Sequence, residues 1–138
     1  MKTIRKEIMV GSPVLKVWKH LTDPNKLGTW LMPNDFEATA GKMFTFQCEP
    51  KGDWDGVVLC EIQEIIPMKK LVFSWTTNVI QVETKVTFTL QETKGQTRVE
   101  LIHSGWDALP ADKKELFEQF DCGWEIFFNQ QLHELIES

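Results

Sequence analysis

The side chains best suited to nucleophilic or metal chemistry in this sequence are three histidines and three cysteines: His20, His103, His133, Cys48, Cys60 and Cys122. They are widely spaced and form no CxxC, HExxH or GxSxG motif. A catalytic nucleophile needs a base within hydrogen-bonding reach. The spacing therefore favours a protein that is not an enzyme, without deciding the question. We predict no catalytic residue, no metal site and no cofactor, and we expect the cysteines to be reduced, buried and structural.

His103 is the histidine with the most informative position. In the predicted strand 97–103 it shares a face with Val99 and Leu101, which predicts that it points inward. An inward histidine is either a core residue held by the backbone or by Ser104, or a polar contact or general base for a ligand. The sequence favours the core interpretation, and the other two histidines are expected at the surface.

Gln131 lies in the apolar stripe of a predicted C-terminal helix that covers residues 111–137. At 100° per residue, this stripe also contains four apolar residues, Leu116, Phe120, Trp124 and Phe127. A buried amide without partners costs about 1–3 kcal/mol. We therefore expect Gln131 to meet a strand residue, to reach solvent at the mouth of a pocket, or to orient a ligand.

Gly123 lies inside the same predicted helix, where glycine is unfavourable by about 1 kcal/mol relative to alanine. A glycine in this position either lets the helix approach a strand, leaves cavity space beside Trp124, or accompanies a bend in the helix.

Aromatic residues are abundant, with six tryptophans, nine phenylalanines and no tyrosine. Strand parity and helix position indicate which of them face inward. These inward rings line a pocket or fill a solid core, and we favour the pocket. Together with His103 and Gln131, the candidate ligand-binding residues are Trp30, Phe44, Phe46, Phe73, Trp75, Phe88, Trp106, Phe120, Trp124 and Phe127.

The remaining pattern predicts the elements that must position these residues. Ser12 is expected to cap the first helix ahead of Pro13, and Asp23-Pro24 to end it. Alternating residues predict strands over 2–10, 43–48, 57–66, 71–75, 82–90 and 97–103, and helical spacing predicts helices over 13–22, 24–31 and 111–137.

This order predicts an α+β helix-grip fold in one domain, 1–138. A helix of about 27 residues spans about 40 Å, which is long enough to cross a whole sheet. Because one helix cannot cover a flat sheet of six to seven strands, the antiparallel sheet is expected to curve around it. The two short helices after the first strand are expected to close one end.

The formal net charge of −5 argues against nucleic-acid binding, which needs a basic surface to contact phosphates. The N-terminal residues lack the apolar stretch of a signal peptide, and no segment has the roughly 20 apolar residues of a membrane span. We therefore expect a cytoplasmic protein with no membrane insertion.

Several short motifs, taken in order, carry a resemblance to a known family. They are Ser12-Pro13, Val17-Trp18, Thr22-Asp23-Pro24, Trp30, the stretch from Gly56 to Pro67, Leu71 to Trp75, Leu101 to Trp106, and Gly123-Trp124. The chain thereby resembles the START and birch-pollen-allergen-like (SRPBCC) superfamily. Within it, the chain is similar to the short bacterial form of the domain named for the activator of heat-shock-protein-90 ATPase. Relatives often carry a histidine in the stretch before Gly123-Trp124, where this chain has Phe120-Asp121-Cys122.

The resemblance implies the helix-grip fold but not one activity, since the superfamily includes lipid carriers, polyketide cyclases and co-chaperones. The favoured function is non-catalytic binding of a small hydrophobic or aromatic molecule, such as a lipid, polyketide or flavonoid, between the sheet and the C-terminal helix. One alternative is a stress-related module that binds a chaperone and activates its ATPase. The other is a cyclase-like or hydrolase-like enzyme in the same pocket, with His103 as the acid–base residue.

Overall fold

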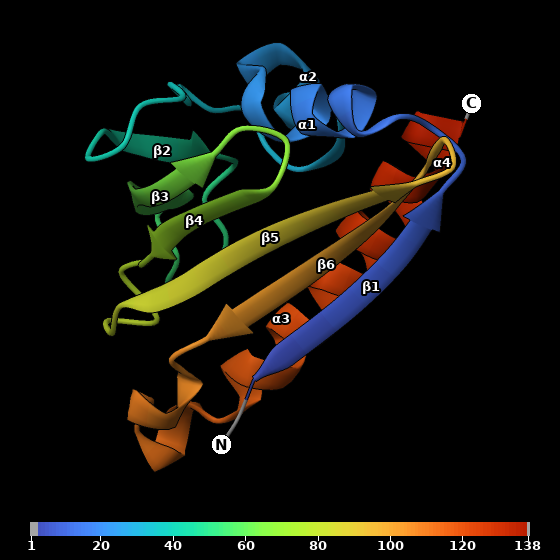
Figure 1. Cartoon of the computed structure of the whole chain (residues 1–138). Helices are drawn as coiled ribbons and strands as arrows, with labels where there is room; N and C mark the ends of the chain where they lie inside the picture. The colour runs from blue at the N-terminus through green and yellow to red at the C-terminus, as the bar shows by residue number, and fades with distance from the viewer. Residues whose placement is uncertain (1–2, 138) are drawn as a thin grey trace.

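A computed structural model describes residues 3–137 and shows a curved, six-stranded antiparallel sheet (Figure 1). Its strands are β1 Ile4–Val10, β2 Met43–Gln47, β3 Val57–Ile66, β4 Lys70–Trp75, β5 Thr84–Thr93 and β6 Gln96–Ser104. The strand order β1-β6-β5-β4-β3-β2 makes β2 to β6 a meander, and β1 pairs with the last strand of that meander. The predicted α+β helix-grip fold is confirmed.

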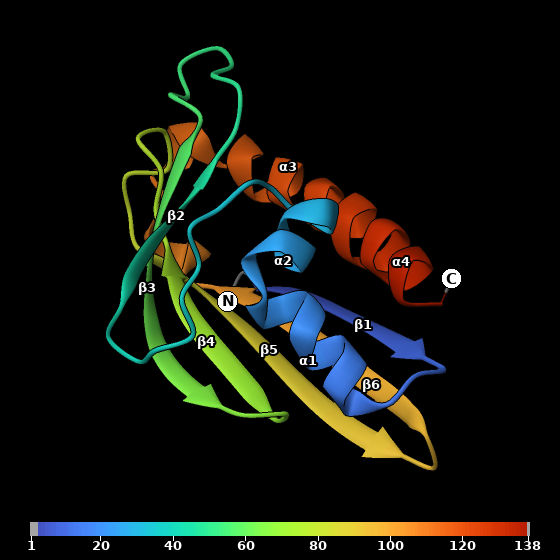
Figure 2. The same ribbon diagram turned by 90° about the horizontal axis from the view of Figure 1, so that it is seen from above.

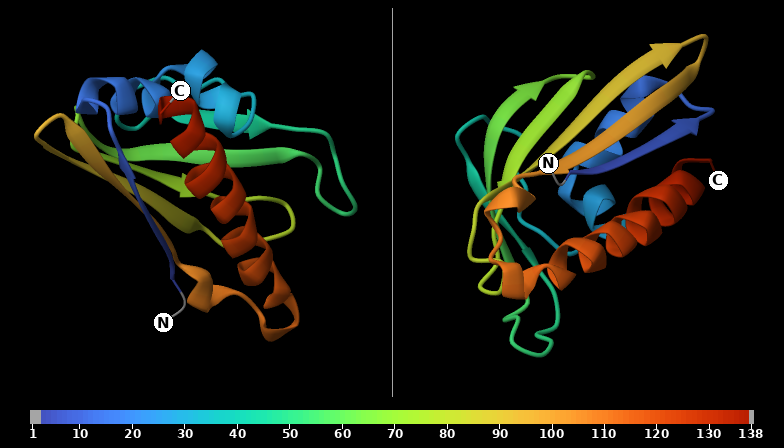
Figure 3. Two further views of the ribbon diagram at one scale, coloured as in Figure 1. Left: turned by 90° about the vertical axis from the view of Figure 1, so that its right-hand side faces the viewer. Right: turned by 90° about the horizontal axis from the view of Figure 1, so that it is seen from below.

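The helices lie at one end of the sheet and across its concave face (Figure 2). Two short helices, α1 Val14–Thr22 and α2 Pro24–Trp30, follow β1. The chain ends in two 3-10 turns, η1 Trp106–Ala108 and η2 Ala111–Lys113, and a long helical rod made of α3 Glu115–Trp124, η3 Glu125–Leu132 and α4 His133–Glu137. Figure 3 shows the rod crossing the sheet, with α1 and α2 beside its C-terminal end.

Alternation along β5 and β6 places the core on the concave face of the sheet. Val86, Phe88 and Leu101 are buried, while the intervening residues face outward. Pairing with β4 begins at Thr84, two residues later than predicted, because Gln81 adopts a left-handed conformation (φ 60°) that belongs to the preceding turn.

Charged groups fix the first helix and the rod. The backbone N–H of Val14 donates to the Glu92 carboxylate (2.6 Å), which takes the capping role predicted for Ser12. Ser12 instead directs its hydroxyl to the Ile136 carbonyl, because it is buried against the rod. Lys6 of β1 forms ion pairs with Asp121 and Glu125, which join the sheet edge to the rod.

The rod is not a uniform α-helix, because η3 is a π-helix. In a π-helix, each backbone N–H bonds to the carbonyl five residues earlier, and each residue rotates the chain by a smaller angle than in an α-helix. Its buried face therefore follows four-residue spacing through Trp124, Phe128, Leu132 and Ile136. The predicted placement of Gln131 in the buried stripe is wrong, because the side chain is exposed.

Substitutions can test which side of the rod faces the core. Leu132→Ala should lower the free energy of unfolding by about 2–5 kcal/mol, because Leu132 is fully buried. The neighbouring exposed change Gln131→Ala should alter it by no more than about 0.5 kcal/mol. Urea unfolding monitored by circular dichroism measures both. Equal losses in the two variants would contradict the assigned face.

Candidate ligand-binding pocket

A pocket of about 940 Å³ opens between the rod and the end of the sheet formed by β3 and β4. This volume suits a small-molecule ligand. Its lining is mainly apolar, and the loop between β2 and β3 contributes two exposed charges, Lys51 and Asp53. The other lining residues are Leu31, Met32, Cys48, Trp54, Val58, Trp75, Thr77, Val79, Ile80, Leu116, Gln119, Phe120, Gly123, Trp124 and Phe127.

Four of the predicted binding residues meet in this lining: Trp75, Phe120, Trp124 and Phe127. Gln131 and His103 are not part of it. The other six predicted residues, all rings with 2% exposure or less, lie in the core outside the lining: Trp30, Phe44, Phe46, Phe73, Phe88 and Trp106. Inward parity therefore identified buried rings correctly, but it did not separate the rings of the core from those of the pocket.

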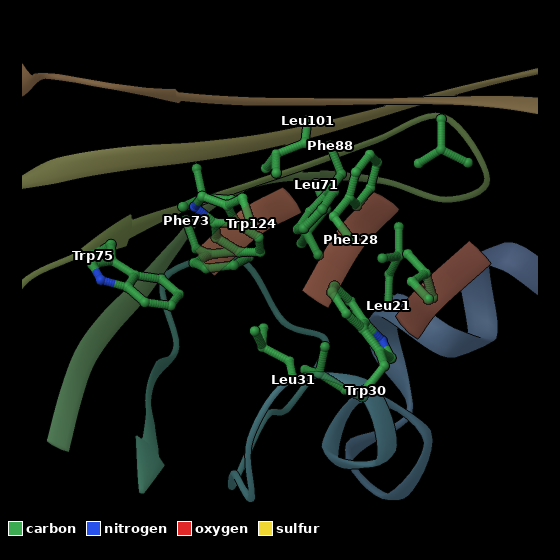
Figure 4. Packing of buried hydrophobic residues seen from close by; sticks show 14 of the residues in the cluster. Leu21, Trp30, Leu31, Leu71, Phe73, Trp75, Phe88, Leu101, Trp124 and Phe128 are labelled. Atoms are coloured by element: carbon green, nitrogen blue, oxygen red, sulfur yellow. The ribbon is translucent and has the colours of Figure 1, made fainter. Parts of the chain in front are cut away.

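The core rings pack against one another beneath the sheet (Figure 4). Phe44 and Phe73 meet edge to face with ring centroids 5.3 Å apart, and Phe88 lies 6.1 Å from Phe128 of the rod. Such contacts add about 0.5–1.5 kcal/mol each beyond burial. In Figure 4, Trp75 and Leu31 lie at the periphery of this cluster, and both line the pocket.

Sequence reasoning missed the loop residues of the pocket. Trp54 belongs to the β2–β3 loop, and Val79 and Ile80 belong to the turn between β4 and β5. A tryptophan outside every predicted element was the available signal for the first of these loops. The turn offered only two adjacent apolar residues.

Gly123 provides room in the pocket. A Cβ built on this residue would meet no heavy atom within 4 Å, and the glycine itself belongs to the lining. Of the three roles that the sequence left open, the structure supports cavity space beside Trp124. The absent side chain leaves a gap in the helix surface that faces the pocket.

A chain of hydrogen bonds behind the pocket wall joins the rod to the sheet. The Trp124 indole N–H donates to His103 Nδ1 (3.0 Å), and His103 Nε2 lies 2.8 Å from Thr84 Oγ1. Because an indole only donates, Nδ1 accepts and Nε2 carries the proton. His103 therefore donates to Thr84, whose hydroxyl donates in turn to the Trp75 carbonyl (2.7 Å).

These bonds define the role of His103. Its side chain is fully buried, and burial lowers its pKa from 6.5 to about 3 because the charged ring would lose its hydration. His103 is thus a neutral core residue, as favoured from the sequence, although Thr84 and Trp124 hold it in place of Ser104. His20 is buried rather than at the surface, with Nδ1 2.8 Å from the Lys16 carbonyl.

Trp75, unlike His103, has a polar ring atom without a hydrogen-bond partner among the described residues. This indole nitrogen is buried, and Asn129 Oδ1 on the rod is likewise buried and without a partner in residues 3–137. An unpaired buried donor costs about 1–3 kcal/mol. Trp75 lines the pocket, whereas Asn129 does not.

Other kinds of site have little support in residues 3–137. In that range, no group of three or more His, Cys, Asp or Glu residues is arranged to hold a metal ion. The cysteines were expected to be buried, which is correct for Cys60 and wrong for Cys48 and Cys122, because both of these are exposed. None of the helices in the same range combines the length and apolar character needed to cross a membrane.

A family model described as "Activator of Hsp90 ATPase homolog 1-like protein" matches residues 12–137. The chain belongs to this family. A crystal structure of a Mesorhizobium loti protein is 31% identical, with 96% of this chain and 95% of that one covered and a TM-score of 0.80. A solution structure of a Bacillus halodurans protein is 28% identical, with 99% and 98% covered and a TM-score of 0.81. No curated protein matches.

The same fold is found at greater distance. The solution structure of the Aha1 dimer from Colwellia psychrerythraea is 19% identical, covers 99% of this chain and 97% of that one, and has a TM-score of 0.81. At this identity, the similarity shows the fold alone. This member of the Hsp90 ATPase activator homologue family therefore has the family's architecture, while its activity must be argued from its own pocket.

The buried neutral His103 makes stability depend on pH. The unfolded chain binds a proton at His103 below about pH 6.5, whereas the folded protein does so only near pH 3. The resulting stabilisation is complete above pH 6.5 and is lost as pH falls toward 3. Between pH 7 and 5, wild type should lose about 2 kcal/mol more of its unfolding free energy than His103→Gln.

Urea unfolding at the two pH values measures this difference, and ring NMR signals of His103 provide a second readout in wild type alone. Those signals should stay constant from pH 8 to 5. A His103 ring that titrates within that range would contradict the assignment.

Proposed function

We propose that this protein binds a small hydrophobic or aromatic molecule, without catalysis, in the pocket between the sheet and the C-terminal rod. The observation that carries the proposal is an apolar pocket of about 940 Å³ beside a well-filled core. A rod residue without a side chain, Gly123, opens space there rather than closing it. Hydrophobic burial would supply most of the binding energy.

The lining rings favour a flat or elongated apolar ligand. Trp75, Phe120, Trp124 and Phe127 come from the sheet and the rod, and such surfaces suit lipids, aromatic polyketides and flavonoids. Lys51 and Asp53 are exposed. The charged part of the lining thus remains in water, where it would contact only a polar end of the ligand.

Two features favour binding over a cyclase-like or hydrolase-like reaction. Among the described residues, the lining contains no histidine, and the one thiol that it contains, Cys48, has no base paired with it by a hydrogen bond. His103, the acid–base candidate, lies outside the lining with both ring nitrogens in hydrogen bonds. A general base must reach the substrate proton, and this histidine does not reach the pocket.

Chaperone binding is the second candidate, because the family description names an activator of a chaperone ATPase. Such a partner would contact an outer surface, so the binding would not require the pocket. A pull-down with the bacterial Hsp90 homologue and an ATPase assay test it. No stimulation by the wild-type protein would remove this candidate.

Filling the pocket from the rod tests the proposed function. Gly123→Leu should raise stability by up to about 1 kcal/mol, because leucine is a better helix former and open space surrounds the new side chain. The same change should weaken ligand binding at least about tenfold by occupying the pocket. Titrations of ¹⁵N-labelled protein with palmitate, flavone and an anthraquinone measure the affinities.

Cys122→Leu is the matched control, because it adds the same side chain to the adjacent exposed residue outside the lining. It should leave the affinities unchanged. Wild-type protein that binds none of the three compounds, or Gly123→Leu protein that binds them as tightly as wild type, would contradict the proposal.

A further inference from the structure

Two polar side chains outside the pocket lining join the segments that surround the pocket. Asn78 lies on the turn between β4 and β5, and Lys113 is the last residue of η2, just before the rod. We infer that Asn78 and Lys113 are positioning residues, which act in series to hold the loop side of the pocket in the form that binds a ligand. This role rests on the proposed binding function and deepens it, because it assigns affinity to residues that the ligand does not touch.

The loop between β2 and β3, residues 48–56, is organised by its own hydrogen bonds. The Cys48 N–H donates to the Gly56 carbonyl (2.7 Å), and Lys51 and Trp54 each donate a backbone N–H to the other's carbonyl (3.0 Å). Gly56 has φ 85°, and a Cβ at this residue would collide with the Cys48 carbonyl oxygen, so the closure of the loop requires glycine. We therefore expect the loop to move as one unit, whose position depends on contacts from outside it.

Asn78 supplies such a contact through both ends of its side-chain amide. Its Nδ2 donates to the Asp53 carbonyl (2.8 Å), and its Oδ1 accepts from the Asp55 N–H (3.1 Å). Two residues of the pocket lining, Asp53 and Trp54, lie on the part of the loop that these bonds hold. Asn78 therefore attaches the loop side of the pocket to the neighbouring turn.

Lys113 attaches the same turn to the start of the rod. Its Nζ donates to the Val79 carbonyl (2.8 Å) and to Gln81 Oε1 (3.0 Å). A hydrogen bond from an ionised donor is roughly twice as strong as one between neutral groups. Val79 lines the pocket, as does Leu116 of the rod, three residues after Lys113. This lysine thus connects two further parts of the lining.

The two attachments form one series from the loop through the turn to the rod. Figure 3 shows these three segments gathered at one end of the molecule. Without the attachments, a ligand would have to order the loop as it binds, and the cost of this ordering would weaken its affinity. Because Asn78 is exposed, its removal should affect the loop far more than the packed core.

Binding measurements on two variants test the role. The probe is whichever of palmitate, flavone and the anthraquinone binds wild type most tightly. Asn78→Ala should raise its Kd about fivefold by releasing the loop. Lys113→Met keeps the apolar stem, removes the ammonium group and should raise the Kd about tenfold, because it releases the turn and the loop together. Stopped-flow tryptophan fluorescence should show most of each change in the dissociation rate.

Each variant has a matched control. Asn25→Ala removes the same side chain from an exposed residue of α2, and Lys114→Met removes the ammonium group from the exposed residue next to Lys113. Neither residue belongs to the pocket lining. Both controls should bind the probe as tightly as wild type, so the change in net charge alone has no effect.

The double variant distinguishes attachments in series from two independent losses. Once Lys113→Met has released the turn, Asn78 no longer fixes the loop to the rod. Asn78→Ala in that background should therefore add little, and the double variant should bind about tenfold more weakly than wild type, where independent effects would give about fiftyfold.

Amide hydrogen exchange separates positioning from a general loss of stability. In Asn78→Ala, the Asp55 N–H loses its acceptor and should exchange at least about tenfold faster. The N–H groups of β5 and β6 should exchange as in wild type. Equal acceleration in the loop and in these strands would mean that the whole domain is destabilised, which would overturn the positioning role.

The remaining outcomes separate this role from the proposed function. Wild-type affinity in both single variants, or a fiftyfold loss in the double variant, would overturn the series of attachments and leave pocket binding standing. If wild type binds none of the three compounds, the proposed pocket function is contradicted, and the positioning role is contradicted with it.

Discussion

A run of hydrogen bonds from Trp124 through His103 and Thr84 to the Trp75 carbonyl joins the rod to the sheet inside an apolar core. The arrangement of the neighbouring side chains depends on these hydrogen bonds, which we call the link. It sets the tautomer of the histidine and holds two pocket indoles from opposite layers beside each other, with centroids 5.6 Å apart. Buried polar groups arranged in this way are costly unless every member is paired. The link therefore favours one position of the rod over nearby alternatives.

The core and the pocket are two results of wrapping one helix in one curved sheet. Where Phe88 meets Phe128, the rings of sheet and rod touch and the space is filled. Toward the start of the rod, Gly123 presents no side chain, and the opposing loops do not fill the gap. Close packing at one end supplies stability, which allows the other end to remain open.

The fold was predictable because its signals are local. Alternation in β5 and β6 and helical spacing in the rod each appear within a short stretch of chain. The pocket was less predictable, since parity says that Phe73 and Trp75 both face inward but not how far along the curved sheet each one lies. Gln131 was misplaced because a π-helix changes the phase of the rod, and the sequence carries no simple signal for it. The Trp124–His103 hydrogen bond was also not predictable, because it depends on how the rod is aligned along β6, and patterns within either element do not show that alignment.

The pocket wall is formed partly by the packed body of the domain and partly by loops, and substitutions in these two parts affect folding differently. Trp75, Trp124 and Phe120 belong to the packed body of the domain, whereas Trp54 and the residues around Val79 come from loops. Substitutions in the body alter packing and hydrogen bonding together, so they carry a stability penalty. Loop substitutions reshape the same wall at little cost to folding. The shape of the pocket can therefore diverge between related chains through the loops, while the helix and sheet that enclose it stay as they are.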